Sequence, residues 1–135
     1  MPTVGEDCSV ILDGHGYFVK PGSFRLEIPK VMAAEPDAAA GPAAVNLGTG
    51  KQVWHFTALA YTNHLNHNGT VNATSAATYR ANLRTSYAKA EALAFTDRLG
   101  AAHRVHMVAL EERISEAAGF WEQPEWEIAI TLVEA

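Results

Sequence analysis

Residues 125–135 read EWEIAITLVEA, and this stretch decides the fold. Along it, large apolar side chains alternate with small or polar ones, which is the pattern of a half-buried β-strand. The set that would face the core is Trp126, Ile128, Ile130 and Leu132. Loosely held chain ends are usually polar, whereas a strand of this kind needs neighbouring strands. We therefore expect this stretch to lie in the core of a sheet, where each of these side chains contributes about 1.5–3 kcal/mol.

The overall composition predicts one globular domain, residues 1–135. A length of 135 residues is typical of a single domain, and 48% hydrophobic with 19% charged residues is typical of a folded one. The net charge of −5 gives no general attraction to nucleic acid or to acidic membranes. The single cysteine, Cys8, cannot form an internal disulfide, and no apolar run approaches the roughly 20 residues of a membrane span.

The first half of the chain predicts short strands separated by turns that contain glycine or proline. An apolar run at residues 10–12 precedes strands at 17–19 and 24–28, and Pro29 places the last of these at its end or at a sheet edge. Residues 51–61 form the strongest strand of this half. Both of its faces are fairly apolar, which favours a central position in the sheet.

A segment of small residues, AAEPDAAAGPAAVNLGTG, separates these strands at residues 33–50. Pro36, Gly41 and Pro42 would interrupt a helix there, so the composition predicts a long surface loop or arm. Loops longer than about 12–15 residues tend to be functional or disordered. Two interpretations stay open: a floppy insertion, or an arm that becomes ordered against a partner.

The second half begins with a predicted helix at residues 76 to about 90, which Thr74 or Ser75 can cap. Apolar residues recur on it at three- and four-residue steps, as on a helix face that packs against a core. The residues of this stripe are Ala76, Tyr79, Leu83, Tyr87 and Ala90.

After the helix, a strand at residues 93–96 and one at 103–110 form a hairpin around a turn at 97–100. Residues 111–116 are a charged connection that could extend the second strand, and residues 119–124 are a turn. One helix among mostly antiparallel strands predicts an α+β fold: a β-sandwich or barrel with one packed α-helix.

Two His-x-x-His pairs are the first candidates for chemistry: His64 with His67, and His103 with His106. Zinc needs three or four converging ligands, and a three-residue step brings two rings to one face only on a helix. The second pair lies in a predicted strand, where the rings would point to opposite faces, and the first lies in a polar loop. We favour surface histidines and predict no metal ligand.

The carboxylates and possible nucleophiles give no clearer signal. Five glutamates cluster late in the chain: Glu111, Glu112, Glu122, Glu125 and Glu127. They lie among charged or turn residues, so solvated faces are favoured over an acid–base pair. No G-x-S-x-G elbow is present, Gly14-His15-Gly16 lacks the rest of a dinucleotide-binding motif, and Cys8 has no nearby histidine. We predict no catalytic and no cofactor-binding residue.

Basic and aromatic residues suggest contact surfaces rather than chemistry. Arg80, Arg84 and Lys89 on the helix are few for a nucleic-acid surface, so a solvated or subunit-facing side is favoured. Phe120 and Trp121 lie beside a turn, where exposed aromatic residues are typical interface anchors. The two other tryptophans, Trp54 and Trp126, are expected in the core.

Several patterns follow one another in the second half: Tyr79-Arg80-x-x-Leu83 on a helix, Leu93-Ala94-Phe95-Thr96-Asp97, His103-x-Val105, Leu110-Glu111-Glu112-Arg113 and the closing WEIAITLVEA of residues 126–135. In this order they resemble the tail-tube-like domain of long-tailed bacteriophage virion proteins, the group of tail tube, distal tail (baseplate) and tail adaptor proteins. The resemblance covers about residues 74–135, with residues 51–61 as the strand before the helix.

This resemblance implies a structural role in a virion rather than catalysis. Such domains form rings, often hexameric, around a channel for DNA, and a long loop in the first half commonly reaches a neighbouring subunit; residues 33–50 would be that arm. The implied partners are copies of the chain and other phage tail proteins, with DNA only passing through and no membrane. The implied location is the virion tail, assembled in the cytoplasm of the bacterial host. A net charge of −5 suits a channel through which DNA slides.

Two other classes of function remain as alternatives. One is a small metal-binding protein or hydrolase that uses the histidine pairs. The other is a β-rich module that binds a ligand.

Overall fold

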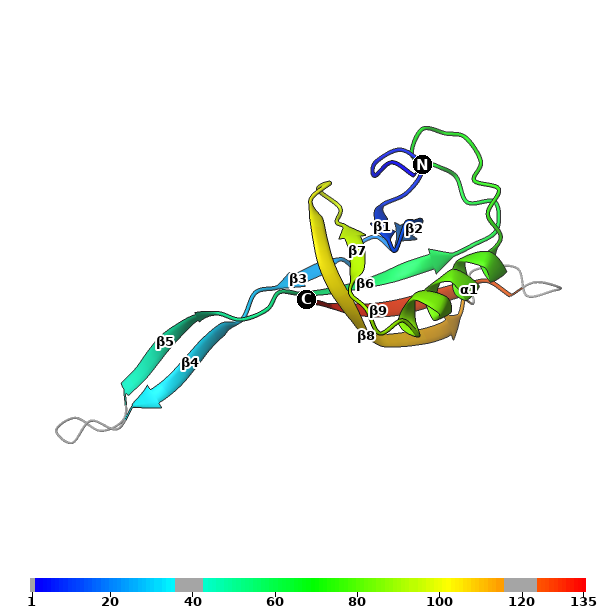
Figure 1. The fold of residues 1–135 in the computed structure, drawn as a ribbon. Coiled ribbons are helices and arrows are strands. Elements are labelled where there is room, and N and C mark those ends of the chain that lie inside the picture. The colour runs from blue at the N-terminus through cyan, green and yellow to red at the C-terminus, as the bar shows by residue number, and fades with distance from the viewer. Residues whose placement is uncertain (1, 36–42, 116–123) are drawn as a thin grey trace.

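A closed ring of six antiparallel strands with one packed helix forms the body of the protein, and a two-stranded arm extends from it (Figure 1). The computed structural model describes residues 2–35, 43–115 and 124–135. The elements in these ranges are β1 (Val10–Leu12), β2 (His15–Val19), β3 (Arg25–Glu27), β4 (Lys30–Glu35), β5 (Ala43–Thr49), β6 (Val53–Ala60), α1 (Ala76–Tyr87), β7 (Leu93–Thr96), β8 (Ala102–Ile114) and β9 (Trp126–Glu134).

The strand ring follows the order β2-β1-β7-β8-β9-β6, and a pairing of β2 with β6 closes it. β6 has β9 along one edge and shares its other edge between β3 and β2. The prediction of mostly antiparallel strands with one packed helix is therefore confirmed, as is the central position of the strand predicted at residues 51–61.

β9 lies between β6 and β8 and pairs with both over its length. Ile128, Ile130 and Leu132 are buried, so the strand predicted from the closing stretch is confirmed. Trp126, also predicted for the core, is only half-buried and lies at the margin of the core. It is the first residue of β9, and its ring contacts Arg80 of the helix.

The core inside the strand ring is rich in aromatic residues from β6 and β7, two strands that do not pair with each other and face each other across the core. The ring of Trp54 meets that of Phe95 edge-on at 5.5 Å, and Phe56 stacks on Phe95 at 6.0 Å. Such pairs add about 0.5–1.5 kcal/mol beyond the buried area. Tyr79 and Leu83 bring the helix into the same cluster, which fixes α1 against the ring.

α1 begins after its N-cap Ser75, whose side chain accepts a hydrogen bond from the backbone N–H of Thr78 at 3.2 Å. The predicted end near residue 90 is wrong, because the helix ends at Tyr87. The last buried position is Ser86, whose hydroxyl donates a hydrogen bond inside the fold, whereas Tyr87 is 44% exposed. Tyr87 and Ala90 thus do not belong to the core-facing stripe.

Residues 33–35 and 43–49, which were predicted to lie in a surface loop, belong instead to the two strands of the arm. β4 and β5 pair from Lys30 opposite Thr49 to Glu35 opposite Ala43, as a separate sheet that reaches away from the ring (Figure 1). The loop prediction is wrong for residues 33–35 and 43–49, because backbone pairing of two strands does not require large apolar side chains. The breakers Pro36, Gly41 and Pro42 fall between the two strands in the sequence; residues 36–42 lie outside the described residues.

Two further strands differ from their predictions. β3 is shorter than expected and exposed along its length, with Leu26 43% exposed. Among the described strands it pairs with the start of β6 alone, which agrees with the predicted edge position before Pro29. β8 continues to Ile114, so the charged stretch from residue 111 extends the strand, with a bulge between Met107 and Ala109.

Candidate functional site

The two histidine pairs lie in different surroundings: His64 and His67 share an aromatic contact, whereas His103 and His106 do not. The ring of His64 stacks on that of Phe18 at 4.0 Å, and His67 meets the same ring edge-on at 5.7 Å. His103 packs 4.7 Å from Trp54, whereas His106 is exposed, so the opposite orientation predicted for this pair is confirmed. In the described ranges, no three His, Cys, Asp or Glu side chains come together as a metal site.

His103 stabilises the turn between β7 and β8 through Asp97. Its Nε2 atom lies 2.8 Å from Asp97 Oδ2, and the backbone N–H groups of Leu99 and Ala101 donate to Oδ1 of the same carboxylate. Burial alone would raise the pKa of Asp97, but these hydrogen bonds outweigh it and lower the pKa below 3.8. This His–Asp contact therefore holds a hairpin turn.

The glutamates bind cations and backbone groups, and the expectation of solvated faces is wrong for two of them. Glu112 and Glu127 have side chains only 13% and 17% exposed, because each lies against a basic residue. Glu127 binds Lys20 at 2.6 Å, and Glu125 accepts a hydrogen bond from a backbone N–H. Glu111 is exposed as expected, and Glu122 lies outside the described residues.

Cys8 is buried beside the turn of the N-terminal segment. Burial, with a further contribution from the neighbouring Asp7, raises the pKa of its thiol from 9.0 to about 12. A thiol that stays protonated at neutral pH is a poor nucleophile. The geometry therefore gives Cys8 a packing role.

The three basic residues on and just after α1 bind two carboxylates. Lys89 Nζ binds Asp13 at 2.7 Å, while Arg80 and Arg84 both bind Glu112 on β8. Hydrogen bonds from Arg84, together with those from Arg80, lower the pKa of Glu112 in spite of its burial. The predicted solvated or subunit-facing side thus keeps Arg84 and Lys89 exposed, and its cations also form ion pairs that fasten the helix to the strand ring.

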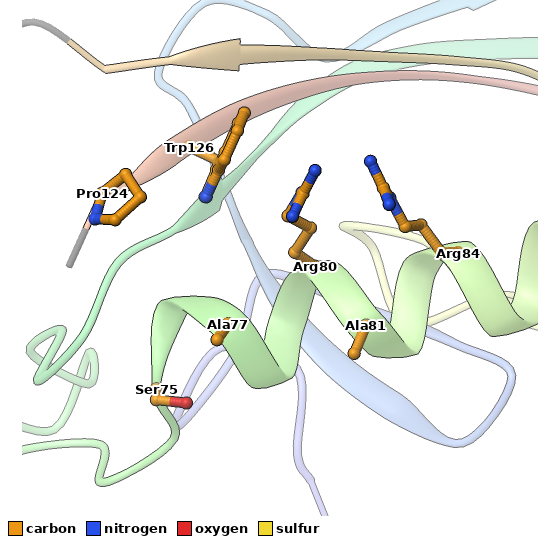
Figure 2. Close-up of a pocket in the computed structure, with 7 residues that line it drawn as sticks. All are labelled: Ser75, Ala77, Arg80, Ala81, Arg84, Pro124 and Trp126. Atoms are coloured by element: carbon orange, nitrogen blue, oxygen red, sulfur yellow. The ribbon is translucent and has the colours of Figure 1, made fainter.

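A groove lies beside the two arginines, between α1 and the start of β9 (Figure 2). The guanidinium carbon of Arg80 lies 4.2 Å from the centre of the Trp126 ring, a cation–π contact. The groove has a volume of about 470 Å³, and its lining residues are Ser75, Ala77, Arg80, Ala81, Arg84, Pro124 and Trp126. Sequence reasoning found the arginine pair but not the groove, because its walls are distant in the sequence.

A second hollow, of about 440 Å³, lies where the turn between β1 and β2 meets α1. It is lined mostly by polar side chains and glycine: Pro2, Asp7, Gly14, His15, Gly16, Asn72, Thr74, Tyr79 and Asn82. Small-molecule sites usually have largely apolar walls. This hollow does not have them, so it gives little support to the ligand-binding alternative.

No protein-family model matches the sequence, and no curated protein matches it. In the described part of the chain, no helix is long and apolar enough to cross a membrane. The predicted interface anchors Phe120 and Trp121 lie outside the described residues.

Proposed function

We propose that this protein is a structural subunit of a bacteriophage tail, without a catalytic site, that assembles with copies of itself into a ring and docks to other tail proteins. The ring is expected to be hexameric and to surround a channel through which DNA passes without specific binding. The site of action is the virion tail, after assembly in the host cytoplasm.

The observation that carries this proposal is the arm of β4 and β5. It is a two-stranded sheet that shares no strand with the ring and extends away from it (Figure 1). An isolated two-stranded sheet is marginally stable in water and leaves backbone groups unpaired along its edges. A second protein surface would supply what the arm lacks, which is why the arm favours assembly.

The order of elements gives further support. β6, α1, the β7–β8 hairpin and β9 follow each other in the order of the tail-tube-like resemblance. The turn at Asp97, which ends the Leu93-Ala94-Phe95-Thr96-Asp97 pattern of that resemblance, is fixed by hydrogen bonds to Leu99, Ala101 and His103. The net charge of −5 is compatible with a channel that DNA does not adhere to.

Removal of the arm tests the proposal. Lys30 and Thr49 pair directly at its base, so a short Gly-Ser turn can replace residues 31–48 without opening the strand ring of the body. We expect the wild-type chain to form oligomeric rings, seen in negative-stain micrographs and as oligomers in light scattering. The shortened chain should keep its near-ultraviolet circular dichroism, which reports the Trp54 cluster, and lose the rings.

Two results would contradict this proposal. A wild-type chain that stays monomeric at the highest soluble concentration would remove the basis for self-assembly. Rings of unchanged size and stability from the shortened chain would show that the arm is not what joins the subunits.

A further inference from the structure

We infer that the groove between α1 and Trp126 is a second assembly contact, which receives a carboxylate side chain from another copy of this chain. This inference rests on the proposed function, because it identifies a contact surface of the same self-assembling subunit. It concerns a different part of the molecule from the arm.

The wall of the groove has more hydrogen-bond donors and more positive charge than its own carboxylate can satisfy. Glu112 accepts hydrogen bonds from Nε of Arg80 and from Nε and Nη2 of Arg84. Each guanidinium carries more N–H groups than these contacts use. Two positive charges and one negative charge leave this cluster with a formal charge of +1. An incoming carboxylate would therefore find both donors and attraction.

The cationic groups are also held in place before any partner arrives. The side chain of Arg80 is only 31% exposed, because it lies between the Trp126 ring and Glu112. Figure 2 shows Arg80 and Arg84 rising from the same side of the helix. Fixed side chains lose little conformational entropy on binding, so the arrangement favours recognition.

The shape of the groove leaves room for more than a single carboxylate. Ala77 and Ala81 line the groove with side chains of a single methyl group, and both are exposed on the helix. Trp126 and Pro124 form an apolar wall against which the CH₂ groups of a glutamate or aspartate can pack. A volume of about 470 Å³ accommodates such a side chain together with its neighbours.

The charge of the chain itself points to a second copy as the occupant. The chain carries a net charge of −5, so the positive cluster is complementary to the rest of an identical subunit. Exposed carboxylates that could enter include Glu6, Glu91 and Glu111. A contact between two different surfaces of identical subunits is the kind that repeats around a ring.

A nucleic-acid phosphate fits the groove less well. Lys89, which follows the C-terminal end of the helix, is already bound to Asp13, so it does not extend the positive surface. Phosphate backbones are bound by several cations that act together, and the net charge of the whole chain repels DNA.

Ala77→Glu tests the inference by supplying a carboxylate from within the groove. Ala77 lies in the first turn of α1, where a negative charge favours the helix, so the fold should be kept. The new side chain is three residues from Arg80 and would compete with the incoming carboxylate. Ala81→Glu places a carboxylate in the groove one helical turn further along, and serves as the second variant if Ala77→Glu does not fold.

Thr78→Glu is the matched control. It adds the same charge one residue away, at an exposed position that does not line the groove, and creates a capping box with Ser75. Sedimentation velocity over a concentration series gives the self-association constant of each protein. We expect Ala77→Glu to weaken association by at least about tenfold and Thr78→Glu to leave it unchanged.

Each outcome decides between the two proposals. If Ala77→Glu and Ala81→Glu both associate as strongly as the wild type, the role of the groove is overturned and the proposed function is left intact. Equal weakening by Thr78→Glu would also overturn it, because the effect would then be one of net charge. A monomeric wild-type chain would overturn the proposed function and the groove contact together.

Discussion

At the scale of single residues, Gly16 shows how tightly the N-terminal segment packs on β2. A Cβ atom at this position would lie 2.8 Å from Cβ of Cys8 and 3.0 Å from Cβ of Pro2. Both distances are shorter than ordinary contacts between carbon atoms. The lack of a side chain at residue 16 therefore allows the N-terminal segment to cover the strand.

Gly16→Ala should destabilise the fold, because either β2 or the N-terminal segment must move to make room for the methyl group. Overpacking of this kind costs about 1–3 kcal/mol. The free energy of unfolding from urea titration measures the effect. An unchanged unfolding midpoint would show that the N-terminal segment is not packed against β2 as described.

The thiol of Cys8 should react slowly in the folded protein. Its pKa is raised from 9.0 to about 12, so little thiolate exists at pH 8. The folded state favours the neutral thiol; the resulting stability is fully present below pH 9 and is lost as the pH rises from 9 toward 12. Labelling with iodoacetamide at pH 8 should be at least about tenfold slower than in urea-unfolded protein. Equal rates would contradict the burial of Cys8.

At the scale of elements, one carboxylate of β8 joins the helix to the ring. Glu112 binds Arg80 and Arg84, which stand one helical turn apart, so a single side chain holds two positions of α1. Its pKa lies below the ordinary 4.5, since both arginines favour the charged form. The stability from this contact is present above about pH 4.5 and is lost as the pH falls through the lowered pKa.

Glu112→Gln should therefore lower the free energy of unfolding at pH 7 by about 1–2 kcal/mol, with the partial exposure of the arginines limiting the effect. Glu111→Gln is the control, because the neighbouring side chain is exposed and points to the other face of the strand. Urea titrations at pH 7 and pH 3 should show a difference between wild type and Glu112→Gln that shrinks at the lower pH. A difference that persists at pH 3 would contradict the ionic origin.

Elements whose signal is local could be predicted from the sequence. The period of two in β9 and in β6, and the Ser75 cap of α1, depend on neighbouring residues alone. The two strands of the arm could not be predicted, because β4 and β5 consist largely of small residues, and such strands are defined by pairing with one another. Closure of the ring by β2 and β6 joins residues some 40 positions apart, which no local pattern encodes.

The candidate surfaces were predictable only in part, for the same reason. The four-residue spacing of Arg80 and Arg84 predicts one side of a helix, and the structure confirms it. Glu112 reaches the two arginines because β8 packs against the helix. Trp126 comes beside Arg80 because β9 pairs with β8. The groove is thus a product of tertiary structure, and its residues become a set only when the ring has formed.

At the scale of the whole molecule, closure of the ring satisfies the strand edges of the body, while β3 and the arm keep edges to the outside. Closed sheets resist edge-to-edge aggregation, so association is directed to the surfaces that remain open. In Figure 1 the arm extends to the left of the body, whereas α1 and the start of β9, whose residues line the groove, lie on the right. A subunit with two dissimilar contacts can join its neighbours in one repeated orientation.

The place of β9 between β6 and β8 has a consequence for biosynthesis. β6 leaves the ribosome well before β9 (Trp126–Glu134). The edge of β6 that pairs with β9 therefore stays unpaired until β9 has been translated. Until then the nascent chain exposes an apolar strand, Val53–Ala60, to other polypeptides and to chaperones. Productive folding is thereby coupled to translation of the last strand, and a ribosome that stalls before it would hold a chain that cannot yet close.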